Sequence, residues 1–156
     1  MTGWRGPAVI VDCDGTLVDV TSIRHHVVPG LPGWAGRKDF DAFHKASVWC
    51  PPIHPTLAAV EEHRAAGRAI LIMTARMRRW EPHTRGWLAT HSVRFDHLFM
   101  RTDGDRRPDT VVKGELLAQA RAMGWDPTHA IDDNPSVIGL WEAEGLDVTV
   151  VDGWIG

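Results

Sequence analysis

The chain has 156 residues, 44% hydrophobic and 24% charged, which is the composition of one soluble globular domain with a buried core. Its net charge of -3 excludes the global basic surface of a protein that coats nucleic acid, although it leaves room for a local basic patch. The two cysteines, Cys13 and Cys50, are too few for a disulfide scaffold, favour a reducing compartment, and show no zinc-site spacing.

The chain begins without the apolar run of a signal peptide, and no apolar run approaches the roughly 18 residues of a membrane span. We therefore expect a cytoplasmic protein without a membrane partner.

Five apolar runs alternate with helical patterns along the chain. The first, PAVIVDC, has no polar alternation and stops at acids and a glycine, which indicates a strand buried on both faces. The predicted strands are Ala8–Cys13, Ala69–Thr74, His97–Met100, His129–Asp133 and Asp147–Asp152. The predicted helices between them are Leu57–Ala66, Glu81–Thr90, Val111–Met123 and Pro135–Gly145.

This alternation predicts an α/β fold whose parallel five-stranded sheet is wound by right-handed crossovers, in a single domain over residues 1–156. One segment, at about residues 19–56, breaks the pattern. It is rich in Pro, Gly, His and Trp, is longer than a simple connection, and contains one helical stretch, Lys38–Val48. We expect a small cap over the C-terminal edge of the sheet, where open α/β proteins bind ligands.

Polar side chains follow the predicted strands and should converge on that edge. They are Asp12, Asp14, Thr74, Arg76, Lys113, Asp132 and Asp133. Taken singly, such acids are usually helix caps or turn formers, such a threonine is an N-cap, and such a lysine is solvated. Together they form a chemically coherent set. Clustered carboxylates bind Mg²⁺, a carboxylate can attack phosphorus, a second acid can protonate a leaving oxygen, and a hydroxyl and an ammonium can hold phosphoryl oxygens.

Four motifs in order resemble those of the haloacid dehalogenase (HAD) superfamily. They are DCDGT at 12–16, the apolar strand ending in Thr74, Lys113, and AIDDN at 130–134. The resemblance covers almost all of the chain and implies the three-layer Rossmann-like fold of that superfamily. An acid two residues after the first aspartate is the form found in phosphatases and is lacking in dehalogenases.

The resemblance also implies a role for each motif residue. Asp12 would be the nucleophile that forms an aspartyl-phosphate, and Asp14 the general acid and then the base that activates water. Asp12, the backbone carbonyl of Asp14, and Asp133 would hold Mg²⁺, with Asp132 acting through water or Lys113. The residues implied to bind the phosphoryl group are Thr74, Ala75, Arg76 and Lys113.

Longer stretches resemble the phosphatase domain of the phage-type polynucleotide kinase-phosphatase, which removes 3′-phosphates from nucleic-acid ends during repair. These stretches are Lys38–Pro52, Met73–Arg76, Phe95–Lys113 and Ala130–Leu146. No GxxxxGK[ST] phosphate loop occurs, so 5′-kinase activity is not expected and a separate kinase or ligase is the expected partner. A solitary domain leaves a second substrate class open, namely small nucleotides or other phosphomonoesters.

Candidate substrate-binding residues lie in two arginine-rich segments and in the cap. They are Arg24, His44, Arg101, Arg106 and Arg107, and the cap adds His25, His26, Lys38 and Trp49. Guanidinium groups suit phosphate oxygens, but these arginines could equally pair with Glu81, Asp103, Asp105 and Asp109. Trp34 or Trp49 could stack on a base, although packing within the core or cap is the favoured interpretation. We expect Trp87, Trp125 and Trp141 in the core.

A phosphorelay receiver, a binding switch, uses a similar set of acids, hydroxyl and lysine. Motif order argues against it, because receivers carry the acid pair on the first strand and here the pair comes last. A receiver also needs no acid two residues beyond its acceptor.

Overall fold

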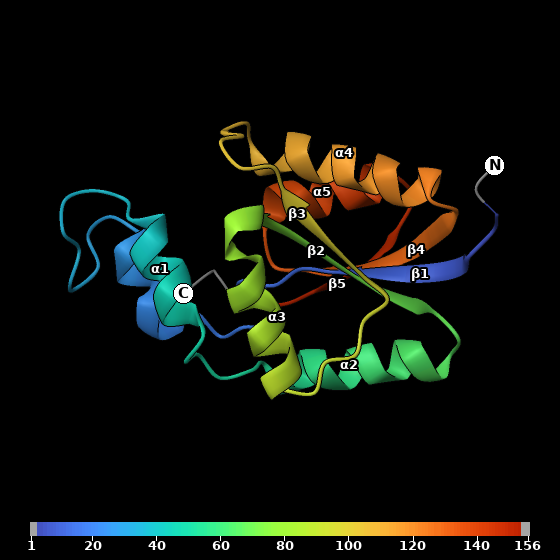
Figure 1. Cartoon of the computed structure of the whole chain (residues 1–156), viewed down its shortest axis with the longest axis horizontal. Coiled ribbons are helices and arrows are strands. Elements are labelled where there is room, and N and C mark those ends of the chain that lie inside the picture. Colours follow the sequence, from blue (N-terminus) through green and yellow to red (C-terminus); the bar gives the residue numbers. More distant parts are fainter. Residues whose placement is uncertain (1–2, 154–156) are drawn as a thin grey trace.

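A parallel five-stranded sheet lies between two pairs of helices in the computed structural model, which describes residues 3–153 (Figure 1). The strands are β1 (Gly6–Val11), β2 (Ala69–Met77), β3 (His97–Arg101), β4 (Trp125–Asp132) and β5 (Asp147–Val150), in the order β3-β2-β1-β4-β5. The helices are α1 (Phe40–Ser47), α2 (His54–Ala65), α3 (Glu81–Thr90), α4 (Asp109–Ala122) and α5 (Pro135–Ala143), with short 3₁₀ turns η1 (Thr21–His26) and η2 (Arg78–Trp80). This confirms the predicted fold class.

The central strand β1 is buried on both faces, as its unbroken apolar sequence predicts. Val9 and Val11 pack into the core on the side of α2 and α3, whereas Ala8 and Ile10 pack into the core on the side of α4 and α5. This division follows from the alternation of side chains along a strand. Because both faces are covered, β1 is held rigidly, and so is the loop that follows it.

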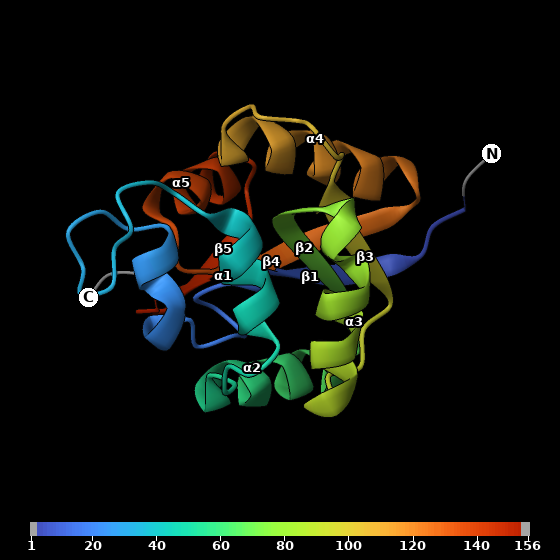
Figure 2. The same ribbon diagram turned by 60° about the vertical axis from the view of Figure 1, so that its left-hand side comes forward.

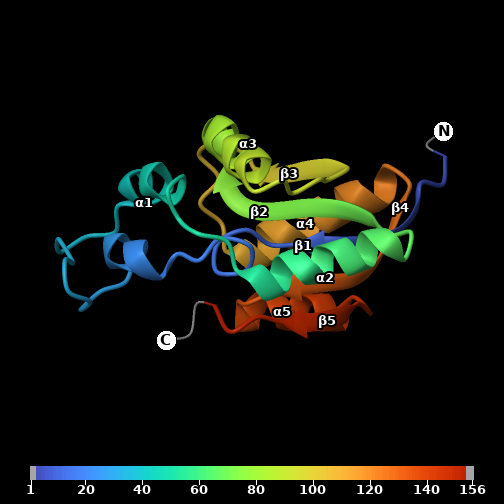
Figure 3. The same ribbon diagram turned by 90° about the horizontal axis from the view of Figure 1, so that it is seen from below.

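All five strands end on one edge, and the segment of residues 19–53 projects beyond it (Figures 2 and 3). We call this the cap segment. Its apolar side chains Val20, Ile23, Val27 and Phe43 join the same core cluster as Val9 and Val11. The indole of Trp87 on α3 also donates a 2.9 Å hydrogen bond to the carbonyl of Cys50. The cap segment is therefore docked onto the body through buried contacts.

Several helix and strand boundaries differ from those that the sequence predicts. The earlier end of β1 places Asp12 and Asp14 in the loop that follows it. β1 ends at Val11, not at Cys13, because the N–H groups of Leu17 and Val18 turn back to the carbonyl of Cys13 at 2.9 and 3.0 Å. β2 continues to Met77, and β4 begins at Trp125, where it pairs with Gly6. α2 begins at His54, with a proline in its first turn, so the cap is shorter than expected.

The tryptophans divide between core and surface. Trp87 and Trp141 are buried as predicted, and Trp125 is partly buried at the start of β4. Trp34 is also partly buried, but the packing expected for Trp49 is wrong, because its side chain is 88% exposed. It follows the end of α1, where its neighbour Cys50 turns inward and leaves Trp49 on the outside.

Within residues 3–153, no helix combines the length and the apolar character required to cross a bilayer.

Candidate active site

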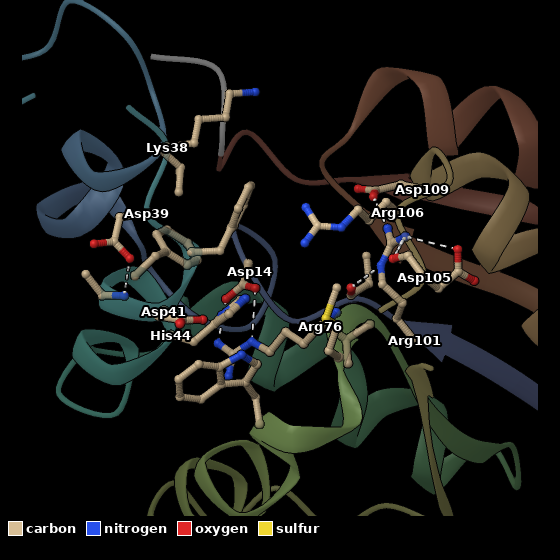
Figure 4. Close-up of a pocket in the computed structure, with 18 of the residues that line it drawn as sticks. Asp14, Lys38, Asp39, Asp41, His44, Arg76, Arg101, Asp105, Arg106 and Asp109 are labelled. Atoms are coloured by element: carbon tan, nitrogen blue, oxygen red, sulfur yellow. Dashed lines mark hydrogen bonds and ion pairs between the residues drawn. The ribbon is translucent and has the colours of Figure 1, made fainter. Parts of the chain in front are cut away.

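A cleft of about 1220 Å³ lies between the C-terminal edge of the sheet and the cap segment (Figure 4). Most residues that the sequence predicts to converge line it, although they come from the loops after β1 and β4, from strand β2 and from helix α4. Those lining the cleft are Asp12, Asp14, Thr74, Ala75, Arg76, Lys113 and Asp133 from the body, and Lys38, Phe40 and His44 from the cap. Asp132 lies beneath its floor.

Lys113 ties the loop after β1 to the end of β4. Its ammonium donates to Asp12 Oδ1 at 2.9 Å and to Asp132 Oδ2 at 3.1 Å. Burial alone would lower the pKa of Lys113, but the two carboxylates raise it above its ordinary value. Lys113 is therefore a permanent positive charge at the bottom of the cleft, where it neutralises part of the acid cluster.

Asp132 is fully buried, and both of its oxygens have protein donors. Oδ2 accepts from Lys113 and from the Trp141 indole at 3.1 Å, whereas Oδ1 accepts from the N–H groups of Asp133 and Asn134. These four hydrogen bonds fill the acceptor positions of a carboxylate. The arrangement argues that Asp132 orients Lys113 instead of binding a metal directly.

Carboxylate oxygens of Asp12, Asp132 and Asp133 lie within 4.8 Å of one another, a group that fits a divalent cation. Asp133 Oδ2 is buried and lacks a hydrogen-bond partner among the described residues. Burial raises the pKa values of both Asp12 and Asp133, and the neighbouring Asp132 adds to this, although Lys113 opposes it. The unpaired Oδ2 of Asp133 and the nearby carboxylate of Asp12 are oxygen ligands of the kind that Mg²⁺ binds.

Two neighbours that the sequence shows only as part of the motif DCDGT shape this cluster. The hydroxyl of Thr16 lies 3.1 Å from Asp12 Oδ2 and 3.0 Å from Asp133 Oδ1, so it links the two acids. Gly15 has a φ of +79°, and a Cβ there would lie 2.3 Å from Asp133 Oδ2. Only glycine fits this position. The signal in the sequence was the pair Gly-Thr directly after the second aspartate.

Asp14 faces a buried arginine. Arg76 Nε and Nη2 donate to the two oxygens of Asp14 at 3.0 and 2.6 Å, and Arg76 Nη1 donates to the Thr84 hydroxyl at 3.0 Å. Although burial opposes it, Arg76 holds the pKa of Asp14 below its ordinary value. In this structure Arg76 donates to Asp14 and Thr84, and its expected phosphate-binding role stays a prediction.

Thr74 and Ala75 lie where the pairing of β2 with β3 shifts register. The Thr74 hydroxyl accepts the N–H of Arg76 at 3.2 Å, which leaves its own proton available to a ligand in the cleft. The carbonyl of Ala75 accepts from Arg101 Nε at 2.8 Å.

The other expected substrate-binding arginines have different surroundings. Arg101 is buried and donates to the carbonyls of Ala75, Asp105 and Arg107 and to Asp109 Oδ1. Arg107 pairs with Asp105 and Glu115 at 2.7–3.0 Å. These pairings match the alternative interpretation of the arginines. Arg106 lines the cleft, whereas Arg24 does not.

His44 brings the cap to the catalytic loops. Its buried ring lies 5.2–6.2 Å, centroid to centroid, from the rings of Phe40, Phe43 and Trp80. Burial lowers the pKa of His44 to about 4, although the nearby Asp14 opposes this. The imidazole is therefore neutral near pH 7, and it joins α1 to Trp80, which ends η2 after β2.

Residues 6–153 match the family model described as the polynucleotide kinase PNKP phosphatase domain, of the HAD type. No curated protein sequence matches the chain significantly. A solved structure of a Pnkp1/Rnl/Hen1 complex has a chain similar to this one, with a TM-score of 0.76 and 23% identity over 93% of this chain and 45% of that one. A second structure, of the Pnkp1/Rnl/Hen1 RNA repair complex, gives a TM-score of 0.72 and 22% identity over 93% and 42%.

A class C acid phosphatase from Bacillus anthracis with tungstate bound has a TM-score of 0.67 and 13% identity, over 97% of this chain and 68% of its own. At 13–23% identity, these similarities to solved structures show a shared fold. The chain spans less than half of the chains that it resembles in the two Pnkp1/Rnl/Hen1 structures.

Proposed function

The chain belongs to the family of polynucleotide kinase PNKP phosphatase domains within the HAD superfamily, and from that premise we propose that it removes 3′-phosphates from polynucleotide ends. The observation that carries the reaction is the placement of Asp12 between Lys113 and Thr16, with Asp14 two residues on at the same cleft. Family membership decides against the receiver alternative.

Asp12 attacks the phosphorus of the substrate, so that a bond forms from its carboxylate oxygen to phosphorus as the bond to the leaving oxygen breaks. Asp14 gives its proton to that leaving oxygen. Asp14 then takes a proton from water, and the water oxygen attacks the aspartyl-phosphate, which releases phosphate and restores Asp12. Lys113 and the Thr74 hydroxyl stabilise the charge on the phosphoryl oxygens.

Asp12 and Asp133 would hold a Mg²⁺ ion, with the backbone carbonyl of Asp14 as the ligand that the family resemblance implies. Mg²⁺ would neutralise the crowded carboxylates and polarise the phosphoryl group. Asp132 supports this site through Lys113, since its own oxygens are occupied by protein donors.

A polynucleotide end suits the cleft because the cleft is open and large. The cap segment places only one α-helix and one 3₁₀ turn over the sheet edge, so it leaves room for a chain that continues past the reacting phosphate. The other substrate class, a small nucleotide or metabolite, would leave much of this volume empty.

A substrate panel tests the proposal. With Mg²⁺ present, we expect turnover of a 3′-phosphorylated oligonucleotide, and little on the 5′-phosphorylated or 2′,3′-cyclic form of the same strand. Asp12→Asn should abolish release of inorganic phosphate, and Asp14→Asn should lower it about 10²- to 10⁴-fold. Turnover confined to free mononucleotides would reject the polynucleotide substrate, and a fully active Asp12→Asn protein would reject the nucleophile.

End healing also requires a 5′-kinase and a ligase, and the 156 residues contain no GxxxxGK[ST] loop. We propose that a separate kinase or ligase activity accompanies this domain. The similarity to a chain from a Pnkp1/Rnl/Hen1 RNA repair complex supports this proposal. Co-purification of the protein with such an activity from its source would test it.

A further inference from the structure

The walls of the cleft carry an excess of positive charge. Three of its acids are neutralised by arginines, as Asp41 pairs with Arg79, Asp105 with Arg107 and Asp109 with Arg101, at 2.6–2.8 Å. Within residues 3–153, four cations that line the cleft form no hydrogen bond through their side chains and no ion pair. These are Arg37, Lys38 and Lys45 from the cap segment and Arg106 from the opposite wall. These four unpaired positive charges favour an anionic ligand that extends beyond the reacting phosphate.

Arg106 stands out because the loop that carries it is fixed. Arg101 donates to the carbonyls of both neighbours, Asp105 at 3.0 Å and Arg107 at 2.7 Å. Arg107 in turn reaches back to Asp105 and forward to Glu115 on α4. The backbone on either side of Arg106 is therefore held, while its own guanidinium points into the open space of the cleft (Figure 4).

The position of Arg106 relative to Lys113 suggests what it binds. Arg106 precedes α4, which begins at Asp109, and Lys113 lies in the second turn of that helix. In the proposed reaction Lys113 serves the phosphate beside Asp12. Both residues line the cleft, but Lys113 is buried whereas Arg106 is exposed to solvent. A guanidinium presents five donors in a fixed plane and suits a phosphate oxygen pair.

We propose that Arg106 forms a second phosphate subsite, which binds the phosphodiester on the 5′ side of the terminal nucleotide. This inference rests on the proposed function and refines it. The enzyme would recognise two successive phosphates, one for reaction at Asp12 and one for binding at Arg106. It would then prefer oligonucleotides and nucleoside 3′,5′-bisphosphates over nucleoside 3′-monophosphates.

The chain supplies a matched control one residue away. Arg107 is in the same loop, is exposed and lines the same cleft, but its guanidinium is engaged by Asp105 and Glu115. Removing either arginine changes the net charge equally, so a difference between Arg106→Ala and Arg107→Ala cannot come from the overall field. Within residues 3–153 the exposed side chain of Arg106 forms no hydrogen bond and no ion pair, and the folding of both variants can be checked by thermal melting.

The experiment measures kcat/KM for thymidine 3′,5′-bisphosphate and for thymidine 3′-monophosphate, and takes their ratio. We expect a ratio of about 10 or more for the wild type, because a charge-assisted hydrogen bond contributes on the order of a tenfold gain in affinity. Arg106→Ala should lower the ratio about tenfold, through KM, and Arg106→Lys should restore part of it. Arg107→Ala should keep the wild-type ratio, and added salt should lower that ratio.

The outcomes separate the two proposals. A wild-type ratio near one, or equal ratios for the wild type and Arg106→Ala, would overturn the second subsite while leaving the 3′-phosphatase intact. Equal losses of the ratio in Arg106→Ala and Arg107→Ala would also overturn it, as an effect of general charge. Absence of turnover on every 3′-phosphate would instead reject the proposed function itself.

Discussion

At the scale of single residues, Asp12 and Asp14 are each held in place by hydrogen bonds from a particular basic side chain. Lys113 contacts Asp12 and Asp132, whereas Arg76 contacts Asp14 through two parallel hydrogen bonds. In the proposed reaction, Asp12 is an unprotonated nucleophile and Asp14 exchanges a proton. Lys113 favours the ionised form of Asp12, and Arg76 likewise favours the ionised form of Asp14. Arg76 also contacts both oxygens of Asp14, so its role is to position this carboxylate and not to keep it protonated.

Replacement of Arg76 by lysine tests this positioning role. Lysine keeps one charge but loses the fork that holds both oxygens of Asp14, so we expect kcat/KM to fall about 10- to 100-fold. Arg76 lowers the pKa of Asp14, and its loss should raise that pKa. Since the first step needs protonated Asp14, the pH above which kcat/KM declines should move upward. Arg79→Lys, which alters an exposed pair with Asp41, is the control. A fall in activity with an unchanged pH profile would mean that Arg76 is merely structural.

At the scale of elements, α1 is the part of the cap segment that faces the catalytic loops. Asp39 accepts the N–H of Ala42 and caps the start of α1. One turn further on, His44 packs against Trp80, so a cap helix touches the residue that leads from β2 into α3. A neutral, buried imidazole at this contact makes the docking of the cap sensitive to acid.

The acid sensitivity can be measured by following thermal stability against pH. The pKa of His44 is about 4 in the folded protein and 6.5 when unperturbed, so the unfolded chain binds more protons between these values. Stability should therefore fall as the pH falls from 6.5 towards 4, by at most about 3 kcal/mol from this group. His44→Phe keeps an aromatic ring and cannot titrate, so its melting temperature should fall less over this window. Identical pH dependence in the two proteins would contradict a buried neutral His44.

At the scale of the whole molecule, the fold brings like charges together and leaves them incompletely neutralised. Asp12 and Asp133 come from the loops after β1 and β4, which are neighbours in the sheet, and Asp133 Oδ2 has no partner among the described residues. A rigid sheet buried on both faces holds the two loops in place despite the repulsion. Binding of a cation would therefore stabilise the entire domain.

Magnesium should raise the melting temperature. At a concentration about 100 times its Kd, a ligand adds about 2.7 kcal/mol of stability. For a chain of this size that corresponds to a rise of roughly 5–10 °C. Asp133→Asn should melt higher than the wild type without metal, because repulsion is relieved, and should gain little from Mg²⁺. Asp126→Asn, at an exposed position near the opposite end of β4, should respond to Mg²⁺ as the wild type does. Equal Mg²⁺ shifts in all three proteins would place the cation elsewhere.

The sequence by itself determined the fold class and the set of catalytic candidates. Unbroken apolar runs such as AVIV are diagnostic of strands buried on both faces, and parallel strands must end on one edge. The convergence of Asp12, Thr74, Lys113 and Asp133 follows from those two facts, and the structure shows it. The ends of the elements were predicted less accurately. The end of β1 is one example, because the turn that follows it depends on hydrogen bonds to the carbonyl of Cys13 and not on composition.

Only the tertiary structure decided which partner each polar side chain takes. Arg76 and Asp14 are 62 residues apart, and Trp141 reaches Asp132 from helix α5, so no local pattern reveals these pairs. The same holds for Arg101 at the end of β3 and for the two arginines of the loop that follows. Arg101 and Arg107 are engaged by neighbours, and Arg106 points into the cleft. Residue type fixes what a side chain can donate, but packing fixes which acceptor lies within about 3 Å of it. That is why the convergence of the site's residues could be predicted from the sequence, while the partners of its arginines could not.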